Sequence, residues 1–139
     1  MVAAFACAGN GVGLDEQGNP IDTANQTSDS ISFATRVQPI FTANCAFAGC
    51  HAGTSPQQGM NLSAGLAHQN IVNVPANERA GMMRVKPFEP DSSYLVHKIQ
   101  GTQGTVGGSG GQMPLGGTPL SAQQISLIRA WITQGAKNN

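Results

Sequence analysis

The heptapeptide "CAFAGCH", residues 45–51, limits this chain more than any other feature of its sequence. Four residues separate its two cysteines, and a histidine follows the second cysteine directly. Residues of these types at short spacing serve covalent haem attachment, zinc binding, or a disulfide beside an ordinary histidine. The choice among these three chemistries depends on the spacing and on the rest of the sequence.

Covalent haem attachment needs two thiols that reach the two vinyl groups of a porphyrin, and an imidazole beneath the iron. His51 directly after Cys50 meets this need, because two thioether bonds force the next side chain under the metal. The usual gap between the cysteines is two residues, so the four residues "AFAG" have to bulge outward. Gly49 is well placed to permit such a bend.

The two alternatives explain less of the motif. A zinc ion would need a fourth ligand, and zinc sites usually separate neighbouring ligands, whereas Cys50 and His51 are adjacent. A disulfide between Cys45 and Cys50 is sterically feasible, but it leaves the adjacent histidine unexplained. We therefore favour haem attachment and keep the zinc site and the disulfide as alternatives.

The composition agrees with a large apolar cofactor. Leu, Ile, Val and Phe account for 28 of the 139 residues, which is near the lower limit for a chain that folds. The formal net charge is zero, so disorder is a poor explanation. A porphyrin would supply part of the missing interior, and a zinc ion would not. The charged fraction is 10% without a run of Lys or Arg, which argues against nucleic-acid binding.

The chain is expected to consist of an irregular N-terminal tether, residues 1–30, and one globular domain, residues 31–139. Cys7 follows the small apolar run "MVAAFA", which resembles the end of a bacterial lipoprotein signal. A lipid anchor at Cys7 and a plain free thiol are both open. No stretch approaches 18 apolar residues, so a membrane-spanning helix is not expected.

The first helix of the domain is expected within residues 30–45, where apolar residues recur at helical spacing. Ser30 or Ser32 is the expected cap. Pro39 lies inside the pattern, lacks a backbone donor and disfavours the helical conformation of Gln38. One kinked helix and two short helical pieces are both compatible with this sequence.

A second, short helix is expected after a long loop. It begins at Asp91 or Ser92 as its cap, and Gly101 ends it. Residues 52–90 before it have only weak helical character, and a Gly-rich loop follows it over residues 101–112.

The last helix has the clearest pattern. Ser121 and Gln124 have the spacing of a capping box, an apolar face follows, and Gly135 ends the pattern. No segment has the pattern of a β-hairpin. The sequence therefore predicts an all-α domain of a few helices and long loops, and loops of this length are typical of chains that wrap a ligand.

A haem iron held by His51 needs a sixth ligand or an open position. Met113 is favoured, because Pro114 stiffens the loop after it and the Gly-rich segment before it lets the backbone approach the ring closely. His68 is the stronger rival, and His97 beside Lys98 is a side chain that could face solvent. The full set of possible ligands is Met60, Met82, Met83, Met113, His68 and His97.

The order of these features resembles the small monohaem c-type cytochromes of the class I fold. A helix, the CxxxxCH motif, a loop, "MP" and a capped helix ending "WITQGA" cover residues 33–136, about three quarters of the chain. The resemblance implies one covalent haem c on Cys45 and Cys50, with His51 as proximal and Met113 as distal ligand. The four-residue gap departs from the usual pattern of the family and leaves the shape of the attachment loop open.

By the same likeness, the N- and C-terminal helices pack across one another, with Phe41 and Trp131 in that contact or in the haem wall. The resemblance implies a single-electron carrier, not an enzyme, that serves redox partner proteins in the periplasm or at the cell surface. One alternative is a haem-bearing subunit of a larger electron-transfer assembly or polymer. Another is a gas or peroxide sensor, if Met113 is not a ligand.

The charged side chains near the expected haem are few. Arg79, Arg84 and Lys86 either meet the haem propionates or lie in solvent. A haem edge ringed by mostly uncharged residues favours partner docking by shape and apolar contact over electrostatic steering.

Overall fold

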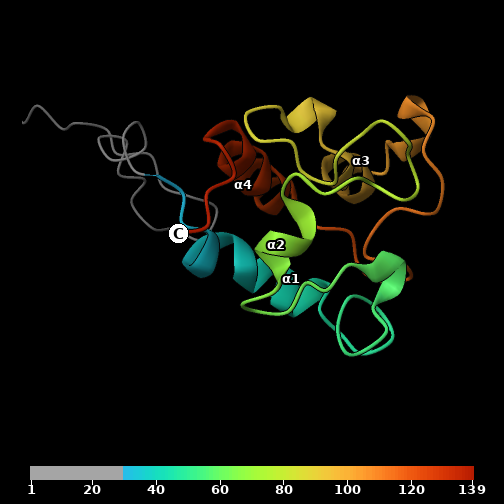
Figure 1. The fold of residues 1–139 in the computed structure, drawn as a ribbon, viewed down its shortest axis with the longest axis horizontal. Coiled ribbons are helices and arrows are strands. Elements are labelled where there is room, and N and C mark those ends of the chain that lie inside the picture. The colour runs from blue at the N-terminus through green and yellow to red at the C-terminus, as the bar shows by residue number, and fades with distance from the viewer. Residues whose placement is uncertain (1–29) are drawn as a thin grey trace, which may run out of the picture.

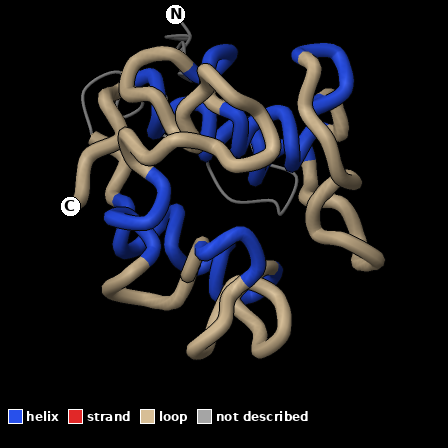
Figure 2. Tube along the Cα trace, turned by 45° about the vertical axis from the view of Figure 1, so that its right-hand side comes forward, coloured by secondary structure: helices blue, strands red, loops and turns tan. Residues whose placement is uncertain are grey.

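The computed structural model describes residues 30–139, in which long loops join short helices (Figures 1 and 2). The α-helices are α1 (Gln38–Asn44), α2 (Ala67–Ile71), α3 (Tyr94–Gln100) and α4 (Ala122–Thr133). Shorter helical turns are η1 (Phe33–Val37), η2 (Gln57–Gly59), η3 (Pro90–Ser92) and η4 (Gln103–Val106). Residues 30–139 contain no β-strand, only isolated bridges, which confirms the predicted all-α class. Cys7 and the tether before Ser30 lie outside the described residues.

The first helical segment is a π-helical turn, η1, that continues into α1. Ser32, one of the two predicted caps, accepts a hydrogen bond on Oγ from the Thr35 N–H at 3.2 Å. Gln38 N–H donates to the Phe33 carbonyl in the wide π turn. Pro39 follows in the first turn of α1, where a missing backbone donor is tolerated. The helix type therefore changes just before the proline.

The described ends of the chain meet at η1. The Asn139 carbonyl accepts a hydrogen bond from Ala34 N–H at 2.9 Å, and Asn139 Oδ1 accepts one from Phe33 N–H at 3.0 Å. Figure 1 shows the C-terminus beside the first described residues. Asn139 thus supplies acceptors for donors that lack a partner at the start of a helix.

The core combines buried side chains of η1, α1, α2, α3 and α4. Ile128, Trp131 and Ile132 of α4 are each 0% exposed, which confirms the predicted apolar face. The rings of Phe33 and Trp131 lie 5.1 Å apart between centroids. Trp131 Nε1–H donates to the Lys137 carbonyl at 2.9 Å, so its buried polar atom has a partner.

The predicted capping box of α4 is present. Ser121 Oγ accepts from Gln124 N–H at 3.2 Å, and Gln124 Oε1 accepts from Ser121 N–H at 2.9 Å. Ser121→Ala should lower the free energy of unfolding by about 1 kcal/mol, because exposed Ser121 provides a cap and no packing. Denaturant titration beside Ser126→Ala, an exposed serine of the same helix, measures the difference. Equal losses in the two variants would contradict the capping role.

The predicted cap of α3 was wrong. α3 begins at Tyr94 after Ser93, because Asp91 and Ser92 belong to the turn η3. Ser93 is fully buried, and its hydroxyl accepts from Lys86 N–H at 2.8 Å and donates to the Glu89 carbonyl at 2.9 Å. The serine thus closes the preceding loop instead of capping the helix.

The predicted end of α3 is confirmed. Gly101 has φ 74°, a left-handed conformation that favours glycine at the end of a helix. His97, on the last turn, is half-buried, and both ring nitrogens have partners, the Thr102 hydroxyl at 2.8 Å and the Asp91 carbonyl at 2.9 Å.

None of the helices within residues 30–139 is long and apolar enough to cross a membrane.

Candidate functional site

A cavity of about 580 Å³ adjoins the CAFAGCH motif. Its volume is within the range of small-molecule and cofactor sites. The lining comes from the end of α1, the motif loop, residues 57–62, residues 76–78 with Arg84, α3, and residues 110–117. Apolar side chains provide much of the wall, among them Phe41, Leu62, Leu95 and Ile99. Cys45, Cys50, His51 and Met113 all belong to this lining.

The motif folds into a tight bulge at the end of α1. Cys45 is the C-terminal cap of α1, and its carbonyl accepts from Phe47 N–H at 3.0 Å and from His51 N–H at 3.2 Å. Gly49 has φ 83°, a left-handed conformation that favours glycine, which agrees with its expected place in the bend. The backbone thus folds the gap back and keeps His51 beside Cys45.

The two thiols differ in their surroundings. Cys45 is 8% exposed and Cys50 is exposed, and the structure holds both as free cysteines, without the disulfide considered as an alternative. Burial raises the pKa of the Cys45 thiol to about 11, and the neighbouring Cys50 acts in the same direction. Both cysteines border the same cavity, one as a buried residue and the other as an exposed one.

His51 is positioned as a metal ligand would be. Its side chain is buried, and Nδ1 lies 3.2 Å from the Met60 carbonyl oxygen. With Nδ1–H donating to that carbonyl, Nε2 is the nitrogen that keeps a lone pair for a metal. Burial lowers the pKa of the imidazole, against the opposite effect of the Met60 and Gln57 backbone, and favours the neutral ring that binds metals.

Met113 is half-buried in the cavity lining, and its N–H donates to the Lys98 carbonyl of α3 at 2.9 Å. Met60 also borders the cavity, but its carbonyl is bonded to the ring of His51. The backbone of Met60 is therefore next to His51, on the side of the imidazole that faces away from Nε2. Met113 comes from a separate segment, residues 110–117, that also borders the cavity.

The other possible ligands are not in the cavity lining. His68 Nε2 lies 2.7 Å from the Ala136 carbonyl oxygen, and its ring packs edge-on against Phe33 at 5.3 Å. Met82 and Met83 border a different cleft. The structure brings Cys45, Cys50, His51 and Met113 to one cavity and places His68 elsewhere.

Arg84 is a buried cation in the cavity wall. Its side chain donates to two neutral acceptors, the Asn70 carbonyl at 2.7 Å and the Gln58 carbonyl at 2.6 Å. Arg84 forms no ion pair within residues 30–139, and burial lowers its pKa. A buried guanidinium without a counter-charge fits a cavity whose ligand carries a carboxylate, as a haem propionate does.

A second charged feature of the wall was not predicted. Lys98 Nζ lies 2.7 Å from Glu78 Oε2, with the two side chains 8% and 18% exposed. Lys98 also donates to the Ser109 carbonyl, as does the Tyr94 hydroxyl at 3.0 Å. Glu78 and Lys98 are far apart in sequence, and no local pattern connects them.

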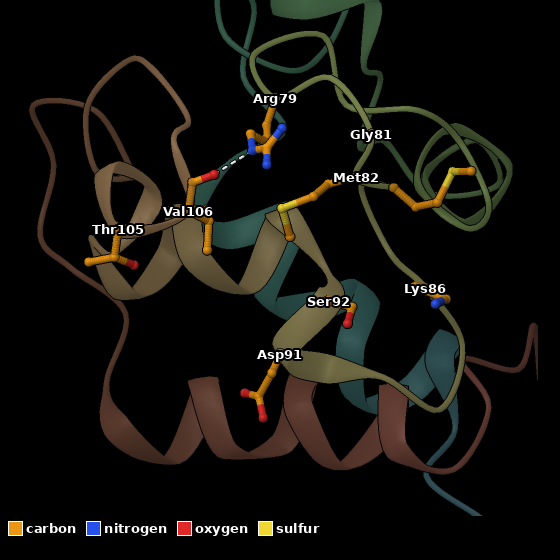
Figure 3. A pocket seen from close by; sticks show the side chains of 9 residues that line it. Arg79, Gly81, Met82, Lys86, Asp91, Ser92, Thr105 and Val106 are labelled. Atoms are coloured by element: carbon orange, nitrogen blue, oxygen red, sulfur yellow. Dashed lines mark hydrogen bonds between the residues drawn. The ribbon is translucent and has the colours of Figure 1, made fainter.

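A second cleft, of about 660 Å³, contains the other two basic residues considered for the propionates (Figure 3). Arg79 donates to the Val106 carbonyl, and Lys86 pairs with Glu89 at 2.7 Å. Asp91, whose side chain is 85% exposed, pairs with Arg129 of α4 at 2.7 Å. These charges already have partners, and no cysteine borders the cleft, so it has fewer features of a cofactor site.

The zinc alternative lacks a ligand set in the described part of the chain, where no group of three or more His, Cys, Asp or Glu side chains is arranged to hold a metal ion. Cys45, Cys50 and His51 therefore border one cavity without converging on one point.

Comparisons with protein-family models, with curated proteins and with solved structures give no match. The functional interpretation accordingly depends on the motif and on the geometry of the cavity.

Proposed function

We propose that this chain is a monohaem c-type cytochrome that carries single electrons between redox partner proteins. Cys45 and Cys50 would hold the haem c, with His51 and Met113 as its axial ligands. The observation that carries the proposal is the single cavity of about 580 Å³ that is lined by both thiols, by His51 and by Met113.

Attachment uses the two free thiols of the motif. Each thiol adds its S–H across one vinyl double bond, so that a carbon–sulfur bond forms and the hydrogen goes to the neighbouring vinyl carbon. The addition is redox-neutral and needs no oxidant. Buried Cys45 and exposed Cys50 lie on either side of the bend at Gly49, and both belong to the cavity lining.

The axial side chains decide what the site can do. His51 would hold the iron through Nε2, because its Nδ1–H bond to the Met60 carbonyl fixes both the tautomer and the ring orientation. The neutral Met113 thioether favours the ferrous state and raises the potential. A bound haem supplies the one-electron iron couple. Two axial ligands from the protein leave no position for a substrate, which suits an electron carrier.

Arg84 supplies the charge that such a ligand needs. Its guanidinium is fixed by two backbone carbonyls and borders the cavity, so it is available to a propionate without a large rearrangement. Pairing would give the buried cation a counter-charge.

Two apolar side chains of the cavity lining are exposed to solvent. Phe47 of the motif is 50% exposed and Leu115 after Met113 is 72% exposed. Both supply uncharged contact surface near the proposed haem, which supports docking of partner proteins by apolar contact. We place the carrier in the periplasm or at the cell surface, with Cys7 as a proposed site of lipid attachment.

Haem staining after denaturing electrophoresis, together with thiol labelling, tests the proposal. We expect a stained band, and we expect Cys45 and Cys50 to resist maleimide after denaturation and reduction, because a thioether has no free thiol. A disulfide would instead give two reactive thiols after reduction, and a zinc site would release them to a chelator. A polypeptide whose mass includes no macrocycle would contradict the proposal.

A further inference from the structure

The last turn of α3 is bonded to the segment that carries Met113. The final carbonyls of a helix have no partner within the helix. The Lys98 carbonyl accepts from Met113 N–H at 2.9 Å, and the Ile99 carbonyl accepts from Gln112 Nε2 at 3.1 Å. Lys98 and Ile99 also border the cavity, so these two bonds fix the methionine to the cavity wall.

The Gln112 side chain fits closely over the end of α3. A Cβ added at Gly101 would lie 2.9 Å from Gln112 Cδ and Oε1, which is closer than such atoms pack. Gly101 has a left-handed conformation that favours glycine. The absence of a side chain at Gly101 thus leaves room for the amide of Gln112 to reach the Ile99 carbonyl.

The chain around Met113 is otherwise rich in glycine. Gly110 and Gly111 precede Gln112, and Gly116 and Gly117 follow shortly after Met113. Glycines leave the backbone many conformations, and fixing them costs entropy. A side-chain bond one residue before the thioether therefore helps to keep Met113 in place, although Gln112 itself is exposed.

We propose that Gln112 is a positioning residue that holds Met113 against α3 and so limits how often the iron loses its sixth ligand. This inference rests on the proposed function. A hydrogen bond of this kind contributes on the order of 1 kcal/mol. Its loss should therefore raise about fivefold the fraction of molecules in which Met113 has left the iron.

Carbon monoxide binding to the reduced holoprotein measures this fraction, because the gas can bind only after Met113 leaves. We expect Gln112→Ala to bind about five times faster than the wild type. Gln112→Glu should bind carbon monoxide at least as fast as Gln112→Ala, because it removes the donor and adds an anion beside helix carbonyls. Gln112→Lys keeps a donor of similar reach and should stay near the wild type.

Gln123→Ala is the matched control, since Gln123 is an exposed glutamine of α4. It should leave the rate unchanged. Amide hydrogen exchange at Met113 is a second measurement that does not depend on gas binding. The Met113 N–H is bonded to the Lys98 carbonyl, and its exchange should accelerate in Gln112→Ala and not in Gln123→Ala.

Wild-type rates of gas binding and of Met113 exchange in Gln112→Ala would overturn the inference and leave the proposed function intact. Gas binding by Gln112→Lys that is as fast as in Gln112→Ala would also overturn it. The hydrogen bond donated by the side chain at position 112 would then not be what holds Met113. A wild-type protein without a thioether-to-iron band would overturn the proposed function itself.

Discussion

Replacement of both Cys45 and Cys50 by alanine is expected to abolish haem retention on denaturing electrophoresis completely. Both thiols border the proposed haem cavity, and neither is engaged in a disulfide. Without thioether bonds, His51 and Met113 could still bind iron in the folded protein, but denaturation breaks these bonds. Haem staining and the mass of the denatured polypeptide measure the loss.

Cys7→Ala is the matched control, because Cys7 is the one cysteine outside the motif. This variant should retain its haem fully. The single variants Cys45→Ala and Cys50→Ala each leave one thiol and are expected to keep haem through one bond. A stained band in the double variant would show that attachment uses other residues and would contradict the assignment.

The elements that the sequence predicted well are those with local causes. The capping box of α4 depends on Ser121 and Gln124, which are three residues apart, and the structure has both bonds. Gly101 and Gly49 each take the positive φ that their positions required. Caps and bends of this kind can be predicted from sequence, because the residues that form them lie within about one helical turn of each other.

The elements that the sequence predicted poorly depend on distant residues. Asp91 or Ser92 was the predicted cap of α3, but both belong to η3, and Ser93 before the helix bonds to Lys86 and Glu89 in a loop whose course the sequence does not reveal. Pro39 was compatible with one kinked helix and with two short helical pieces. Residue propensities alone did not predict the π turn that precedes it. Such choices are made by tertiary packing.

The same division holds for the candidate site. Cys45, Cys50 and His51 are within one motif, and their common cavity could be expected from their spacing. Arg84, Arg79 and Lys86 were equal candidates for a propionate partner in the sequence. The structure distinguishes Arg84, because it is the one that is buried in the cavity wall. The ion pair of Glu78 with Lys98 and the bond from Gln112 to α3 join segments of different loops and helices, and no sequence pattern indicated them.

Met113→Ala is expected to lower the reduction potential by on the order of 100 mV, a fraction of the ~0.8 V range over which axial ligands tune haem iron. The thioether favours the ferrous state, and alanine offers no donor atom in its place. The variant should also lose the thioether-to-iron charge-transfer band and bind carbon monoxide rapidly when reduced. Potentiometric titration and the oxidised spectrum measure these effects.

The control for this variant is Met82→Ala, because Met82 is half-buried but borders the second cleft. It should leave the potential and the spectrum unchanged. Unchanged spectra in Met113→Ala would move the assignment to Met60 in the lining or to His68. His68 would have to give up its bond to the Ala136 carbonyl and its packing against Phe33 to reach the iron. A His68→Ala variant that loses the sixth ligand would therefore also imply a rearranged C-terminal segment.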